Sequence, residues 1–234
     1  MMKLFIFKQR LGEYAECLTL NAQRLRLKAE GEKLTTNTNH MGKGRLEAFS
    51  DGVLAIIITI MVLEMKVPHG DDWKALSLLY PVFINYILSF IYIAIYWNNH
   101  HHMMHATHKI NGKVMWANSH LLFWLSLMPF TSGWMGESHF AAVPTASFGL
   151  VLFMAGVAYY VLEQCLIKLH GQDSLLAKAV GSDSKGIISV VIYGFAIGLA
   201  FVEGWISLCL YAVVAIMWLI PDKRIERKLN EEME

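Results

Sequence analysis

The distribution of charge along this chain limits its fold more than any other feature. Of its 39 Lys, Arg, Asp and Glu residues, 13 lie in residues 1–45 and 9 lie in residues 221–234. The 175 residues between these ends hold only 17, well below the roughly 25% that is typical of soluble domains. Because so apolar a centre is unsuited to a water-exposed surface, the predicted fold class is an all-α membrane protein.

Six apolar segments are long enough to span the hydrocarbon core, which needs about 17–25 residues. They cover residues 46–65, 76–97, 114–134, 145–166, 186–202 and 204–220. The last two are treated as a hairpin, because one helix of their joint length would extend about 52 Å. Pro129 is expected to kink the third segment. The sequence thus predicts six transmembrane helices per subunit within a domain of residues 42–221.

Charged residues in the loops predict the orientation. Basic residues gather before the first segment, between the second and third, between the fourth and fifth, and after the sixth. Under the positive-inside rule, both termini are cytoplasmic, in a multi-pass protein of the bacterial inner (plasma) membrane. Residues 1–41 carry apolar residues at helical spacing, compatible with an amphipathic helix, and residues 222–234 form a charged cytoplasmic tail.

The junction between the N-terminal region and the first apolar segment is a candidate site. Arg45, Ser50 and Asp51 lie at the mouth of a segment that is otherwise apolar. Ionisable groups near a membrane interior are costly and persist mainly where they face protein or water. An alternative is a simple helix N-terminus that Ser50 and Asp51 stabilise through capping and the helix dipole.

The helix that follows this junction carries a possible functional face. At 100° per residue, one face is shared by five residues: Gly52, Ile56, Thr59, Ile60 and Leu63. An apolar helix would show a similar stripe on any face. The pattern therefore gains weight only from the polar mouth on the same helix.

A histidine-rich run follows the second apolar segment, at His100, His101 and His102 and again at His105 and His108. The spacing of His101 and His105 suits a transition metal, but no cysteine or nearby carboxylate accompanies them, and we expect no dedicated metal site. We expect instead that His100 and Asn99 form hydrogen bonds with the mouth of the first helix. A third polar group, Asn118 to His120, lies near the same cytoplasmic level and needs partners across helices.

Several function classes find no support in the sequence. The cysteines Cys17, Cys165 and Cys209 are widely spaced and outline neither disulfides nor a zinc site. With a net charge of +1 and no separate basic patch, the chain is not expected to bind nucleic acid. No nucleotide-binding loop, nucleophile elbow, paired-carboxylate site or HExxH motif is present. We therefore expect a protein that is not an enzyme and has no bound cofactor.

The RxxxFSD pattern formed by Arg45, Phe49, Ser50 and Asp51 carries a family resemblance. With it, and with the run from Gly52 to Ile56 and Thr59, the chain resembles the transmembrane protein 175 family of potassium channels. The resemblance extends to the end of the second segment and to the end of the sixth: Trp97, Asn99, His100 and His101, and Ile220, Pro221 and Asp222. The single six-helix unit is similar to the prokaryotic members.

This resemblance implies a homotetramer in which helix 1 of each subunit lines a central pore for K⁺ and other monovalent cations. The constriction would be a ring of Ile56, with Ile60 and Leu63 beyond it and Thr59 as a polar neighbour. The family pattern assigns a structural network to Arg45, Phe49, Ser50, Asp51, Trp97, Asn99 and His100. The implied partners are other copies of the chain and the lipid bilayer. The alternative is a secondary transporter or divalent-metal carrier that uses residues 100–108.

Overall fold

The computed structural model describes residues 42–180 and 184–219. The chain divides into two units, Met1–Gly42 and Lys43–Glu234, and the fold described below belongs to the second. The amphipathic helix predicted within residues 1–41 and the charged tail predicted at residues 222–234 lie outside the described residues.

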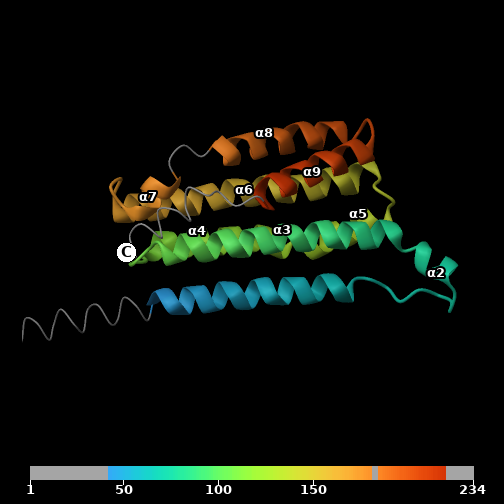
Figure 1. The fold of residues 1–234 in the computed structure, drawn as a ribbon, viewed down its shortest axis with the longest axis horizontal. Helices are drawn as coiled ribbons and strands as arrows, with labels where there is room; N and C mark the ends of the chain where they lie inside the picture. Colours follow the sequence, from blue (N-terminus) through green and yellow to red (C-terminus); the bar gives the residue numbers. More distant parts are fainter. Residues whose placement is uncertain (1–41, 181–183, 220–234) are drawn as a thin grey trace, which may run out of the picture. The chain divides into compact units, whose positions relative to one another are not determined.

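Regular structure in the described ranges is helical, with no strand among them, as predicted. The first helix is Gly42–Leu63. The helices that follow are labelled in Figure 1: α2 (Trp73–Ser77), α3 (Tyr80–His105), α4 (Gly112–Ser126), α5 (Met128–Glu137), α6 (Ala142–His170), α7 (Leu175–Val180), α8 (Ser184–Leu199) and α9 (Gly204–Leu219).

Within the described ranges, the first helix, α3 and α6 are long and apolar enough to cross a membrane. Helices α8 and α9 are apolar but shorter. The third predicted segment is divided at Leu127 into α4 and α5. The break lies two residues before Pro129, which lacks an amide hydrogen and whose ring crowds the preceding turn. Six crossings per subunit remain a prediction.

Helices α3 and α6 extend furthest beyond the segments predicted from hydropathy. Helix α3 covers residues 80–105 rather than 76–97 and includes the histidine run as far as His105. Its first turn contains Pro81, whose fixed φ suits a helix start. Helix α6 ends at His170, where Gly171 adopts a φ of 91°, a left-handed value that glycine tolerates best. Hydropathy marks the apolar part of a helix, so the polar ends were missed.

Helices α4, α5, α8 and α9 pack against α6, while α3 contacts α5 and α9. Some of these contacts require glycine. A Cβ added to Gly136 of α5 would lie 2.9 Å from the Cα of Val82 in α3. A Cβ added to Gly149 of α6 would collide with the Tyr211 hydroxyl of α9. Small residues thus let these backbones and side chains approach closely.

Buried tyrosines connect four helices in the interior. Tyr92 of α3 donates a hydrogen bond to the Tyr211 carbonyl oxygen (2.6 Å). Tyr193 of α8 donates to the Tyr92 hydroxyl (3.3 Å), and Tyr211 of α9 donates to the Thr145 carbonyl oxygen of α6 (3.2 Å). Polar groups without water must be satisfied inside the protein. This chain of hydroxyls meets that requirement and fixes the relative positions of α3, α6, α8 and α9.

Candidate functional site

The first helix packs against its own subunit through one face. Five side chains on this face are buried: Leu46, Ser50, Leu54, Ile57 and Met61. Their spacing of three or four residues places them on one side of an α-helix. Four of the five are apolar and pack into the interior of the subunit. The fifth, Ser50, is the polar residue around which the site is built.

A buried polar network holds this face near its N-terminal end. The Asn118 amide nitrogen of α4 donates to Ser50 Oγ (2.9 Å), and Ser50 donates in turn to the Leu46 carbonyl oxygen (2.9 Å). Asn118 Oδ1 lies 2.8 Å from His100 Nε2 of α3. Because the Asn118 nitrogen is directed at Ser50, its oxygen must accept, and His100 therefore carries its proton on Nε2. Three helices meet through these side chains.

A second contact lies beside this network. Trp97 Nε1 of α3 donates to Asp51 Oδ1 (3.0 Å). The Trp97 ring also stacks on His101, with ring centroids 6.2 Å apart and planes at 28°. Ser50 and Asp51 are adjacent, so α3 and α4 hold neighbouring positions of the first helix. The predicted group Ser50, Asp51, Trp97 and His100 is brought together by the structure.

Three residues of the family pattern lie outside this network. The Asn99 side chain donates to the Ile95 carbonyl oxygen of its own helix (2.9 Å), and the Asn99 carbonyl oxygen accepts from Tyr159 of α6 (3.3 Å). The Phe49 side chain is exposed. Arg45 is also exposed.

Arg45 and Asp51 do not form a salt bridge within the described part of one subunit. Six residues separate them, which places their side chains about 120° apart around the helix. At this end of the helix, Lys43 instead forms a salt bridge with Glu47 (3.9 Å), four residues further along.

The opposite face of the first helix is not covered by the part of the subunit that the structure describes. Ile56 is 59% exposed and Leu63 is 80% exposed, and Gly52 and Thr59 are also exposed. Ile60 lies at the edge of this face and is exposed at 39%. The Thr59 hydroxyl donates to the Ile56 carbonyl oxygen (2.8 Å), so its oxygen lone pairs remain available outward. We call Gly52, Ile56, Thr59, Ile60 and Leu63 the uncovered face.

The far end of the first helix is tied to α5. Lys66 Nζ lies 2.6 Å from Glu137 Oε1. The hydrogen bond and the charge of Glu137 raise the pKa of Lys66 above its usual value of 10.5. A Cβ added to Gly133 of α5 would lie 3.8 Å from the Glu64 side chain, so α5 also approaches the end of the helix closely.

The histidine run does not form a metal site in the structure. His101 and His105 lie at the predicted helical spacing, with ring centroids 6.3 Å apart. In the ranges that the structure describes, however, no group of three or more His, Cys, Asp or Glu side chains is arranged to hold a metal. Because protein metal sites usually need at least three such ligands, the pair carries no metal assignment.

The central role of Asn118 was missed by sequence reasoning. Its place in a polar group on the third segment indicated only that it needs a partner across helices. In the structure it bridges Ser50 and His100 and is itself completely buried. The available signal was an amide within an apolar segment, which is stable there only when both its donor and its acceptor are satisfied.

Comparison with known proteins supplies the family. The family model described as "Endosomal/lysosomal potassium channel TMEM175" matches residues 45–129. The chain is also 54% identical over 191 residues to a potassium channel of Chryseobacterium sp. (strain P1-3), covering 82% of this chain and 100% of that protein. The chain belongs to the TMEM175 family. The matched range includes the segment from Arg45 to Asp51 and the residues of the buried network.

Other TMEM175 relatives agree with this assignment. A potassium channel of Streptomyces collinus (strain DSM 40733 / Tue 365) is 30% identical over 189 residues, which are 75% of this chain and 90% of that protein. The crystal structure of a lysosomal potassium-selective channel TMEM175 homologue from Chamaesiphon minutus matches with a TM-score of 0.66 at 27% identity, covering 77% of this chain and 97% of that one. The predicted family is confirmed.

Proposed function

We propose that the chain is a potassium-permeable channel that conducts passively through a central pore of a homotetramer. Relatives that match most of the chain are named potassium channels. The observation that carries the proposal is the uncovered face of the first helix. Apolar side chains as exposed as Ile56 and Leu63 mark a surface that meets lipid or another protein copy, and four such faces can enclose a path.

The buried side of the first helix, which we call the anchored face, would determine the direction in which the uncovered face points. Its residues are Leu46, Ser50, Leu54, Ile57 and Met61. Asn118 holds Ser50 through a buried hydrogen bond and Trp97 holds Asp51 through an exposed one, so rotation of the first helix would break both. Ile56 lies on the side of the helix away from Ser50, since a step of six residues leaves the two side chains about 120° apart around the helix. The network would thus affect conduction indirectly, because it orients the first helix and does not itself contact the ion.

The chemistry of the uncovered face supports weak selectivity for K⁺. A ring of Ile56 side chains would form an apolar constriction, which opposes any ion that must lose water and can close by dewetting. Because K⁺ holds its water less strongly than Na⁺, such a ring favours K⁺. Ile60 and Leu63 would continue the apolar wall. The outward oxygen of Thr59 would replace part of the lost hydration.

We also propose that the subunit crosses the bacterial plasma membrane six times, with both termini in the cytoplasm. The loop charges and the even number of apolar segments support this orientation. In it, the buried network and the start of α8 lie on the cytoplasmic side, while the Lys66–Glu137 pair lies on the outer side.

The proposal is tested by K⁺ flux into liposomes that contain the full-length protein. Ile56→Asn places an amide in the constriction, and we expect flux to change at least about tenfold, equivalent to about 1.4 kcal/mol in the barrier, with loss of preference over Na⁺. Ile216→Asn is a matched control, because Ile216 of α9 is 58% exposed and Ile56 is 59% exposed. Unchanged flux and selectivity in Ile56→Asn would remove the pore assignment.

Subunit geometry gives a separate test. In a background without native cysteines, a thiol reagent added to Ile56→Cys is expected to block flux, and cross-linkers are expected to join subunits through this position. Ile216→Cys is the control for labelling from lipid. Four subunits around Ile56 are expected. If the thiol reagent labels Ile56→Cys from the lipid phase and flux is not blocked, the pore arrangement is contradicted.

The transporter or metal-carrier alternative is not favoured. No metal-binding group occurs among the described residues of the histidine run, and the relatives that cover most of the chain are named channels. Flux that persists without a proton gradient or divalent metal is the expected result.

A further inference from the structure

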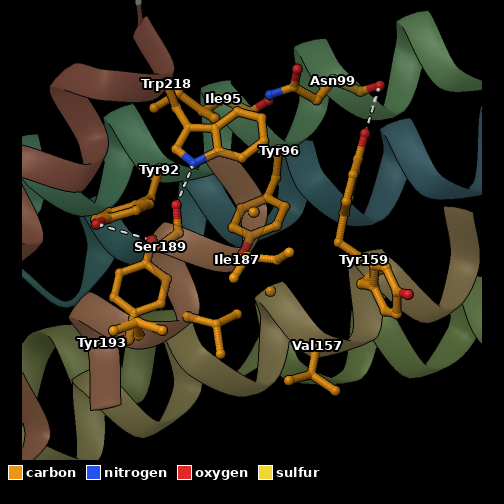
Figure 2. A pocket seen from close by; sticks show the side chains of 15 residues that line it. Tyr92, Ile95, Tyr96, Asn99, Val157, Tyr159, Ile187, Ser189, Tyr193 and Trp218 are labelled. Carbon is orange, nitrogen blue, oxygen red and sulfur yellow. Dashed lines mark hydrogen bonds between the residues drawn. The ribbon is translucent and has the colours of Figure 1, made fainter. Parts of the chain in front are cut away.

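We propose that a cavity between α3, α6 and α8 binds one acyl chain of an anionic phospholipid from the cytoplasmic leaflet. The cavity has a volume of about 300 Å³, at the lower end of the range for ligand pockets. Figure 2 shows the side chains around it, with Trp218 of α9 at one end and Val157 of α6 at the other. This inference depends on the orientation proposed above but not on ion conduction.

The walls of the cavity suit an apolar occupant. Its lining consists mainly of aromatic and aliphatic side chains, such as Tyr96, Val157 and Ile187. The polar side chains near Trp218 satisfy one another, because Trp218 Nε1 donates to Ser189 Oγ (2.8 Å) and Ser189 donates to the Lys185 carbonyl oxygen (2.7 Å). A polar ligand would find few partners here and would lose its hydration. A hydrocarbon chain has no hydration to lose on entry.

The Tyr96 hydroxyl is an exception among these polar atoms. It forms no hydrogen bond to another residue in the described part of the chain, and Figure 2 shows its ring projecting between Trp218 and Tyr159. A hydroxyl in an apolar wall can donate to an ester oxygen, the polar group at the head of an acyl chain. This placement agrees with a lipid that enters by its chain and leaves its headgroup outside.

The position of the cavity selects a lipid over other occupants. It is bounded by the N-terminal half of α8, from Gly186 to Tyr193, which lies in the cytoplasmic half of the membrane in the proposed orientation. Lys185 immediately precedes Gly186 and adds positive charge at this end, which attracts anionic headgroups. The chain's own tail fits poorly, because 9 of the 14 residues from 221 to 234 are charged.

Two glycines supply a matched pair of variants. A Cβ added to Gly156, in the cavity wall, would lie 3.7 Å from Val190 Cγ2 and 4.0 Å from the Tyr96 hydroxyl. These are ordinary contact distances, so a methyl fits and a longer side chain extends into the cavity. A Cβ added to Gly194 of α8 meets nothing within 4 Å, and Gly194 does not line the cavity. Gly156→Leu therefore fills the cavity, and Gly194→Leu is the control.

The test uses phosphatidylglycerol with a diazirine in one acyl chain, mixed into liposomes that contain the full-length protein. After illumination, peptide mapping is expected to find the label on residues 156–160 of α6 and 186–193 of α8. Gly156→Leu is expected to reduce this label at least about fivefold, and Gly194→Leu to leave it unchanged. Phosphatidylcholine with the same chain is expected to label the site several-fold less.

Several outcomes would overturn the proposal. One is a peptide map of the wild-type protein in which the label lies only on other helices. This result needs no variant, so misfolding of a variant cannot explain it. A second is labelling of the cavity in Gly156→Leu that equals the labelling in wild type. A third is labelling by phosphatidylcholine that equals the labelling by phosphatidylglycerol, which would show that the site does not select an anionic headgroup. Cross-links showing a neighbouring subunit or residues 220–234 in the cavity would assign it a different occupant. Flux measurements on Ile56→Asn decide conduction separately.

Discussion

The two faces of the first helix differ in almost every physical respect. The anchored face is buried and combines apolar packing with hydrogen bonds to α3 and α4, through Asn118 and Trp97. The uncovered face is apolar and exposed, and Thr59 bonds only within its own helix. The contrast shows that the two faces of one helix can have different roles. One side fixes position within the subunit, and the other is left for whatever surrounds the subunit.

The largest expected difference between the faces is in stability. Leu54 is 2% exposed and Ile56 is 59% exposed. Leu54→Ala leaves a cavity in packed protein and is expected to cost about 2–5 kcal/mol, whereas Ile56→Ala removes few contacts within the subunit and is expected to cost at most about 0.5 kcal/mol. Thermal unfolding of the two purified variants measures this. Equal losses of Tm would show that Ile56 is packed as tightly as Leu54.

The next effect concerns the buried network. Asn118→Leu removes the bonds to Ser50 and His100 together, so that Ser50 keeps only its bond to the Leu46 carbonyl oxygen and His100 Nε2 loses its partner, at an expected cost of about 1–3 kcal/mol. The expected readout is a lower Tm and a lower yield of folded protein. Asn98→Leu makes the same change at an exposed position of α3 and is expected to be nearly neutral. A neutral Asn118→Leu would mean that apolar packing alone positions the helix.

A smaller effect is expected at the edge of the anchored face. Trp97→Phe removes the hydrogen bond to Asp51 and is expected to cost about 0.5–1.5 kcal/mol. Asp51→Asn retains an acceptor oxygen and is expected to cost less. Trp116→Phe, at an exposed tryptophan of α4, corrects for the change in ring size. If Asp51→Asn is the more harmful variant in thermal unfolding, the charge of Asp51 matters more than its bond to Trp97.

Much of this arrangement is predictable from sequence because it depends on local chemistry. The apolar segments follow from length and hydropathy, and the break before Pro129 follows from the missing amide hydrogen. The site at Ser50 and Asp51 was predicted because polar groups at that depth need partners. The uncovered face of Ile56 and Leu63 was chosen by family resemblance, since hydropathy alone does not distinguish the faces of an apolar helix.

The partners within the site were less predictable, because they depend on how helices rotate against one another. His100 was expected to bond directly to the mouth of the first helix, but Asn118 stands between them. Asn99 was assigned to the network, yet its side chain bonds to Ile95 of its own helix. A one-residue step turns a helix by about 100°, so neighbours in sequence such as Asn99 and His100 face different surroundings. Sequence spacing alone does not reveal which surroundings those are.

The smallest expected effect comes from the Lys66–Glu137 pair, which ties the far end of the first helix to α5. The folded protein raises the pKa of Lys66 above 10.5. Stability from a raised pKa is fully present below the unfolded value and is lost as pH rises through the folded value. The Tm difference between wild type and Glu137→Gln is therefore expected to stay constant from neutral pH to about pH 10 and to shrink above it.

Because both side chains are exposed, this difference is expected to be small and to weaken in high salt. Glu203→Gln, at an exposed acid between α8 and α9, is expected to show no such pH dependence. A difference that grows above pH 10.5, or one that salt leaves unchanged, would contradict the pairing. The anchored face would then depend on its buried network alone, with no contribution from the far end of the helix.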